Sequence, residues 1–385
     1  MAKLCPFRKA SWVPTPPDPD PEDPTFDPED GSWLWVTRSP YNATGNGSTD
    51  DRAAIQACIN AAASQSKGAY FPAGTYHMLA SSGTGLAIPS NVALRGVGDT
   101  SVVQLYDAGT DARHVLANFQ NKSNVTVKNL KLTGTQTNKE ASVQNCWCSG
   151  ATNITFDHVT WGGCEYAIRT TTNASWANGI NVLDCTTLTS VLNPFYLSYC
   201  NAFYLDGGTY EANRVDCVPT RWPHHFYVSG YTSNLTVKNA TFTGGQHAMM
   251  TIDGPQLSDV LFQNIVIEDM YQGICFYFEG TNIVFDGLIA STARMDPSNP
   301  EWFRFADGAR NITIKNFNIT GDPNRNDFLC RVNGPSGSNC LFKNGIMTSC
   351  YTSGTNPPGT VVGSQQGTAP EYDNVVINTP PAIST

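Results

Sequence analysis

Apolar and polar residues alternate in short runs that recur along most of this chain. Many of these runs open on Asn and continue with alternating aliphatic and polar residues, as in Asn-Val-Thr-Val-Lys-Asn from Asn124. The copies begin at Asn91, Asn124, Asn153, Asn234, Asn282, Asn311, Asn339 and Asn374. Strict alternation predicts β-strands, and repetition roughly every 25 to 35 residues predicts a solenoid.

Each run presents one apolar face that it cannot shield alone. Val125 and Val127, for example, fall on one side of their strand, with Thr126 on the other. Neighbouring coils must therefore stack to bury these residues in one continuous core. Because Asn tolerates left-handed backbone at a turn, we expect the recurrent Asn to stack as a ladder at one corner. The pattern predicts an all-β fold, a parallel β-helix.

One segment near the start has helical instead of strand periodicity. Ile55, Cys58, Ile59 and Ala62 fall on one helical face, and Thr49 is a suitable N-cap residue. Acidic residues follow Thr49 directly, where the positive end of the helix dipole favours them. We expect this amphipathic helix to cap the open N-terminal end of the solenoid.

The chain divides into four parts by composition. Residues 14–31 are dense in Pro, Asp and Glu, which predicts a stiff, extended tether. Residues 1–13 are basic and slightly apolar, and we interpret them as a docking peptide, with a disordered tail as the alternative. Residues 32–350 form the β-helix, and residues 351–385, rich in Gly, Pro and Thr, are expected to form a C-terminal cap that contributes to trimer contacts.

Composition narrows the possible partners. The net charge of −9 argues against nucleic acid and membrane surfaces as partners. No run is apolar enough for a membrane span, and residues 1–9 hold no signal peptide, so we expect synthesis in a cytoplasm without an export signal. The 12 Cys are then expected to be reduced and mostly buried, and neither a metal site nor a cofactor is predicted.

Three motifs in the first hundred residues carry a family resemblance. They are Thr-Asp-Asp at residues 49–51, Phe-Pro-x-Gly-x-Tyr at residues 71–76 and Asn-Val-x-Leu-x-Gly-x-Gly at residues 91–98. In this order they resemble the pectate-lyase-like superfamily, whose members are right-handed parallel β-helices. That superfamily includes polysaccharide lyases, glycoside hydrolases, uronate epimerases and bacteriophage tailspike or tail-fibre proteins. Asn46 departs from the pattern, since members often carry Asp there.

Carboxylates recur just before the glycines that end several strands. The strands end at Gly150, Gly230, Gly254, Gly280, Gly308 and Gly334. Alignment on these glycines puts Asp253, Glu279 and Asp307 in one outward column, at a spacing of about 4.8 Å. Crowded acids have raised pKa values, and carboxylate pairs about 5 or 9.5 Å apart cleave glycosidic bonds. These three residues are candidate catalytic groups; the alternative is a solvated turn column.

The position three before each glycine forms a second outward column, mostly aromatic. It holds Trp147, Tyr227, Thr251, Tyr277, Phe305 and Arg331. Flat rings beside acids suit the faces of sugars, although packing against a neighbouring subunit would cover the same stripe equally well. His224, His225 and His247 lie near this face and could serve as a base or orient the substrate. By strand alternation, Arg304 is expected to point inward.

Two functions remain open at this point. The first is a virion tail spike or fibre, a homotrimer that attaches through its N-terminus to other tail proteins, binds host-surface polysaccharide and can also cleave it. The second is a free carbohydrate-active enzyme, a glycoside hydrolase before a lyase or epimerase. The acidic tether and the missing export signal favour the first. No cluster of Lys and Arg suited to lyase chemistry is evident on the strands.

Overall fold

The structure is a computed structural model that describes most of the chain from residue 26 onward. The described residues are 26–79, 83–106, 114–135, 143–171, 175–188, 191–212, 223–245, 247–252, 257–269, 274–291, 301–305, 309–320, 328–332, 339–348 and 371–378. The docking peptide expected at 1–13 and most of the tether lie outside them. So does most of the C-terminal cap expected at 351–385.

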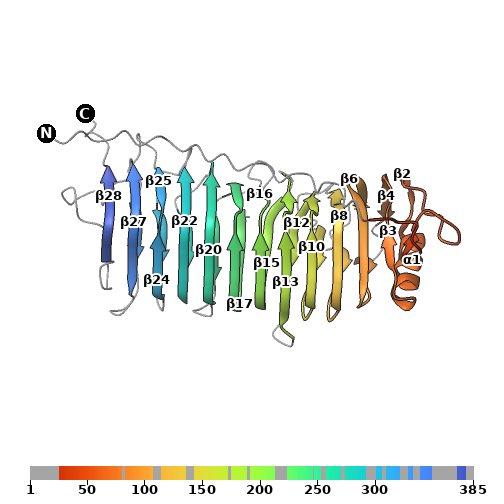
Figure 1. The fold of residues 1–385 in the computed structure, drawn as a ribbon, viewed down its shortest axis with the longest axis horizontal. Helices are drawn as coiled ribbons and strands as arrows, with labels where there is room; N and C mark the ends of the chain where they lie inside the picture. Colours follow the sequence, from red (N-terminus) through yellow and green to blue (C-terminus); the bar gives the residue numbers. More distant parts are fainter. Residues whose placement is uncertain are drawn as a thin grey trace.

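The described chain folds as a right-handed parallel β-helix, with its coils stacked along one long axis (Figure 1). Its strands pair in parallel with their counterparts one coil away, and they fall on three faces that we call sheets 1, 2 and 3. Several strands run around a corner and serve two sheets. This architecture was predicted from the repeat, and it is confirmed.

The strand bounds, taken sheet by sheet, are as follows. Sheet 1 contains β5 (Thr84–Ala87), β7 (His114–Asn118), β9 (Val143–Trp147), β12 (Cys164–Arg169), the first parts of β15 (Val191–Asp206) and β17 (His224–Lys238), β19 (His247–Ile252), β21 (Ile274–Phe278), β23 (Glu301–Phe305) and β26 (Phe328–Val332). Sheet 2 contains β1 (Trp33–Trp35), β3 (Gly68–Tyr70), β10 (Thr152–Asp157), β13 (Ala177–Leu183), β24 (Arg310–Lys315), the second parts of β15 and β17, and the first parts of β6 (Val92–Tyr106), β8 (Ser123–Thr135), β20 (Leu257–Glu268), β22 (Gly280–Ser291), β27 (Cys340–Thr348) and β28 (Glu371–Asn378). Sheet 3 contains β2 (Asn46–Asp50), β4 (Gly74–Leu79), β11 (Thr160–Gly162), β14 (Thr186–Thr187), β16 (Thr209–Ala212), β18 (Thr241–Gly244), β25 (Asn318–Thr320) and the second parts of β6, β8, β20, β22, β27 and β28.

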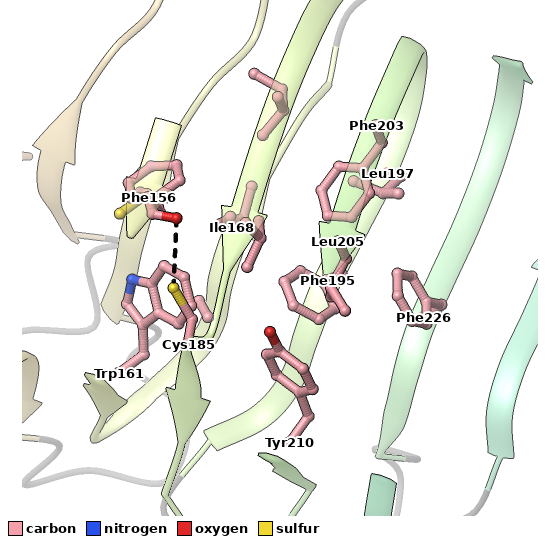
Figure 2. Packing of buried hydrophobic residues seen from close by; sticks show 14 of the residues in the cluster. Phe156, Trp161, Ile168, Cys185, Phe195, Leu197, Phe203, Leu205, Tyr210 and Phe226 are labelled. Carbon is pink, nitrogen blue, oxygen red and sulfur yellow. Dashed lines mark hydrogen bonds between the residues drawn. The ribbon is translucent and has the colours of Figure 1, made fainter. Parts of the chain in front are cut away.

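The interior is a continuous apolar core in which aromatic rings repeat from coil to coil. Val125 and Val127 are buried, as the alternation predicted. Phe195 stacks on Phe226 one coil later, with ring centroids 4.9 Å apart, and further rings fill the surrounding space (Figure 2). Such stacked pairs contribute about 0.5–1.5 kcal/mol beyond the burial of their area.

Polar ladders run along two corners, whereas one was expected. At the corner between sheets 1 and 2, the Asn124 side chain donates from Nδ2 to Oδ1 of Asn91 at 2.9 Å, and Asn153 donates to Asn124 at 2.9 Å. At the corner between sheets 2 and 3, Asn239 donates to Asp206 at 2.7 Å. Asn374, which we had grouped with the first corner, belongs to the second, because it donates to Asn344 at 3.1 Å.

Helix α1 (Arg52–Ser64) covers the N-terminal end of the solenoid (Figure 1). Its buried residues are Ile55, Cys58, Ile59 and Ala62, as predicted. The predicted N-cap was wrong, because Thr49 ends up in β2 and Asp51 takes the N-cap position. The Asp51 carboxylate accepts hydrogen bonds from the backbone N–H groups of Thr44 at 2.6 Å and Gly45 at 2.9 Å. Asp51 therefore fixes the preceding loop instead of capping the helix.

The last residues assigned to the tether pack on the first coils. The centroid of the Phe26 ring lies 5.3 Å from that of Trp33. The Arg95 guanidinium lies over the Phe26 ring, 3.6 Å from its centroid. The Trp35 Nε1–H donates to the carbonyl of Pro28 at 3.1 Å. The described end of the tether, from Phe26 onward, is thus fastened to the β-helix.

Seven cysteines in the described part of the chain are buried and free. Burial raises the pKa of the Cys58 and Cys200 thiols to about 12, so they stay protonated at neutral pH. They act as small apolar residues within the core, as expected. Within the described ranges, no helix has the length and apolarity that crossing a membrane requires.

Candidate functional site

Strand register defines a column of residues along sheet 1. Tyr196 of β15 pairs with Tyr227 of β17, and Tyr277 of β21 pairs with Arg304 of β23. From β9 to β26 the column reads Trp147, Arg169, Tyr196, Tyr227, Met250, Tyr277, Arg304 and Arg331. We call it the sheet 1 column. It contains the predicted residues Trp147, Tyr227, Tyr277 and Arg331.

The register corrects the predicted column at two positions. Met250, not Thr251, pairs with Tyr277, and Arg304, not Phe305, pairs with it on the other side. Phe305 is buried in the core and Arg304 is partly exposed, the opposite of what alignment on glycines gave. The spacing between strand and glycine therefore differs by one residue among these coils.

Rings in the middle of the column form a continuous layer. The Tyr196 and Tyr227 rings stack with centroids 5.0 Å apart and 16° between their planes. Tyr166 approaches Tyr196 at 5.2 Å, and the Arg169 guanidinium lies 5.6 and 5.5 Å from these two rings. His224 lies over Tyr227 at 5.5 Å and 24°. Each of these tyrosines is only partly buried, so the layer reaches the surface.

A break in the strand alternation explains why Tyr166 and Arg169 share this layer. Ala167 and Ile168 between them are both buried, so two successive residues lie on the inner side. The same break recurs at His225 and Phe226. The register with the neighbouring strands is unbroken here, so the two inward residues leave Tyr166 and Arg169 both partly exposed on sheet 1.

This break places His225 inside the β-helix. Its ring lies 5.2 Å from Phe242, and Nε2 lies 3.0 Å from the carbonyl of Thr243. The substrate-binding position expected for His225 is therefore wrong, and its neighbour His224, which stacks on Tyr227, is itself buried. His247 pairs in backbone register with His224, and Arg331 pairs with Arg304. Their side chains are not among those described.

Hydroxyl groups support the aromatic column from beside it. Ser149 Oγ accepts from Trp147 Nε1–H at 2.6 Å and from the backbone N–H of Thr171 at 2.6 Å. The Tyr196 hydroxyl lies 3.0 Å from Ser229 Oγ. These bonds fix the ring orientations, and a surface that is already ordered loses less entropy when a ligand binds.

Two carboxylates lie beside tyrosines of this face. The partly buried Glu279 accepts a hydrogen bond from the Tyr277 hydroxyl at 3.2 Å. Burial is the main cause that raises the pKa of Tyr166, followed by the charge of Glu165 and their hydrogen bond. The phenol therefore stays protonated at neutral pH. Asp253 and Asp307, the other two predicted acids, lie outside the described residues.

Sequence reasoning missed Tyr166, Arg169 and Tyr196. The strands of Tyr166 and Tyr196 do not end in the glycine on which the columns were aligned, so two coils of sheet 1 were skipped. Their positions in the sequence could have revealed them, because both strands fall between coils that had been recognised, at the spacing expected of further coils. Among the described side chains, no three His, Cys, Asp or Glu residues gather as a metal site would require.

Comparisons with known proteins agree with this fold. Residues 36–109 match the family model for rhamnogalacturonase A/epimerase, pectate lyase-like. All three sequence motifs noted above fall in this stretch. The sequence has no significant match among curated protein sequences.

Solved structures cover most of the chain at low sequence identity. The A-module of the Azotobacter vinelandii mannuronan C-5 epimerase AlgE6 matches with a TM-score of 0.63 and 15% identity, covering 90% of this chain and 100% of that one. A tailspike protein of E. coli bacteriophage HK620 with a bound hexasaccharide matches with a TM-score of 0.65 and 13% identity. That match covers 89% of this chain and 65% of the tailspike chain. The Streptococcus pneumoniae adhesin PfbA matches with a TM-score of 0.56 and 12% identity, covering 90% and 98%. The protein is therefore a right-handed parallel β-helix, and its residues 36–109 resemble the pectate-lyase-like family model.

Proposed function

We propose that the outer face of sheet 1 binds a polysaccharide on a host cell surface. The observation that carries this proposal is the layer of Tyr166, Arg169, Tyr196 and Tyr227. Partly exposed rings offer flat faces to the C–H surfaces of sugars, and the adjacent guanidinium and hydroxyl groups supply hydrogen bonds. Such groups in successive coils suit a chain of repeating units, because they recur at the strand spacing of about 4.8 Å.

We further propose that the protein is a bacteriophage tail spike or fibre located in the virion tail. The acidic, Pro-rich segment before the β-helix would hold it away from the tail, with residues 1–13 contacting other tail proteins. The shared fold with an oligosaccharide-bound tailspike supports this assignment. A homotrimer is proposed as its assembled form, with residues 351–385 contributing contacts.

Cleavage of the bound glycan is the second part of the proposal. Of the three acids proposed as catalytic, Glu279 is the one whose position the described residues give, beside Tyr277. Asp253 and Asp307 remain its proposed partners. A free glycoside hydrolase is the competing assignment. The pair of Tyr277 and Glu279 favours a hydrolase, because such a pair can hold a proton donor close to a bound sugar.

The test compares two tyrosines of the same strand. Tyr196 lies on sheet 1, whereas Tyr204 lies on sheet 2, where its hydroxyl donates to Asp206 at 2.6 Å. Retention on immobilised bacterial O-antigen and capsular polysaccharides should weaken about tenfold in Tyr196→Ala, because one stacking contact is worth roughly 1 kcal/mol or more. Tyr204→Ala should bind like the parent. Equal binding by both variants would refute the assignment to sheet 1.

A further inference from the structure

Three aromatic rings gather at the corner where sheet 1 turns into sheet 2. Trp176 stacks on Tyr231 with centroids 5.9 Å apart and 30° between their planes. Tyr199 completes the group at 6.0 Å from Trp176 and 5.9 Å from Tyr231. Trp176 is 42% exposed and Tyr231 is 47% exposed, so two of these rings are open to solvent. We call Trp176, Tyr199 and Tyr231 the corner patch.

The backbone at this corner is shaped around the Tyr199 ring. Tyr199 has a φ of 54°, a left-handed conformation that bulky residues rarely adopt, whereas nearby coils turn with Gly150 and Gly230 at a φ of 66°. A side chain on Gly230 would place its Cβ 3.2 Å from the Tyr199 ring. Strained backbone of this kind is concentrated at functional sites. The glycine and the strained tyrosine together hold the three rings in place.

The strand segments that carry the patch are polar but uncharged. Residues 175–178, 198–201 and 229–233 contain no Asp, Glu, Lys, Arg or His. Ser175 Oγ donates to Asn121 Oδ1 at 3.1 Å, and Asn201 Nδ2 donates to Asn178 Oδ1 at 3.0 Å. Exposed rings rimmed by hydroxyl and amide groups suit a ligand with apolar faces and hydroxyl edges. This differs from the sheet 1 column, which carries Arg169 and Arg304.

The patch is continuous with the proposed glycan face. Tyr199 follows Tyr196 in β15, and Tyr231 follows Tyr227 in β17. These separations of three and four residues span at most about 10 and 13 Å of strand. The two aromatic groups therefore lie on the same two coils, on either side of the turn that leads from sheet 1 to sheet 2.

We propose that the corner patch is a second glycan subsite that takes the face of an uncharged pyranose ring. This inference rests on the proposed glycan binding by sheet 1 and adds a subsite to it. A polysaccharide seated on sheet 1 extends over the corner, so that a neutral residue of its chain stacks on Trp176 and Tyr231. The subsite thus selects for a neutral sugar at one position of the repeating unit.

The test uses the full chain and paired substitutions at exposed rings. The probes are dextran, galactomannan and neutral O-antigen polysaccharides, with alginate and hyaluronate as anionic members, each cast in a gel for affinity electrophoresis. Trp176→Ser with Tyr231→Ser should weaken retardation by neutral polysaccharide about tenfold or more, and Tyr231→Phe should retain it. Ile346→Ser, at an apolar residue that is also 47% exposed on sheet 3, should have no effect.

The outcomes separate this inference from the proposed function. Retardation lost in Tyr196→Ala but kept in the corner variant would overturn the subsite while sheet 1 binding stands. Failure of every polysaccharide to retard the parent protein would overturn both. If the corner variant changes the mass found by light scattering and leaves retardation unchanged, the patch is a contact between copies of the chain and the inference is wrong.

Discussion

Replacement of Asn124 tests whether the corner ladder stabilises the β-helix. Its side chain takes part in two hydrogen bonds, as donor to Asn91 and as acceptor from Asn153, both at 2.9 Å. Its backbone is left-handed, with a φ of 56°. Asn124→Ala removes both bonds and also puts a Cβ-bearing residue without local hydrogen bonds into the left-handed region.

The two contributions can be separated by a matched variant. Loss of two solvent-exposed bonds should cost about 1 kcal/mol in total, at the lower end of the range for single bonds. The left-handed conformation should cost Ala about 1 kcal/mol more, whereas Gly adopts it freely. We therefore expect about 2 kcal/mol of destabilisation for Asn124→Ala and about 1 kcal/mol for Asn124→Gly.

Urea unfolding followed by circular dichroism measures this difference. The midpoints should fall in the order parent, Asn124→Gly, Asn124→Ala, with an unchanged dependence of the unfolding free energy on urea concentration. Equal stability of the Ala and Gly variants would show that left-handed backbone does not select Asn at this corner. Equal stability of the Gly variant and the parent would show that the ladder bonds contribute nothing.

Three further predictions concern chemistry and charge. Glu279→Gln should abolish cleavage or weaken glycan binding by about 1.5–3 kcal/mol with an unchanged melting temperature, and unaltered turnover and binding would remove Glu279 from the site. The buried cysteines, such as Cys58 with a pKa of about 12, should react with iodoacetamide only after unfolding, and a defined disulfide among them would contradict their free state. Burial alone would raise the pKa of Asp157, but hydrogen bonds from His158 and Lys128 lower it overall. Its stabilising contribution is therefore full above about pH 4 and is lost as the pH falls further, so Asp157→Asn should destabilise the protein at pH 7 and much less at pH 3 in thermal unfolding.

The inner positions of the coils could be predicted because burial imposes a period of two on each strand. Ile312 and Ile314 are buried, as their spacing required. The recurrent Asn could be predicted as a ladder because few residues tolerate left-handed backbone. The same reasoning gave the buried face of α1, where Ile55 and Ile59 recur at helical spacing.

The outer face could not be predicted to the same accuracy, because nothing in the outward residues fixes their register. Two successive buried residues at Ala167 and Ile168 interrupt the inward–outward alternation within one strand, and the sequence pattern alone does not reveal such a break. The glycines used for alignment follow their strands at distances that vary by one residue. That variation exchanged Arg304 with Phe305 and Met250 with Thr251. Tyr196 was missed because its strand does not end in such a glycine.

A crystal structure with a bound oligosaccharide tests the central claim most directly. The ligand would be a fragment of whichever polysaccharide retains the parent protein. The account predicts sugar rings along sheet 1 over Tyr166, Tyr196 and Tyr227, with Arg169 within hydrogen-bonding distance of the ligand. Sugar bound only on sheet 3, with the rings of sheet 1 packed against another copy of the chain, would contradict it.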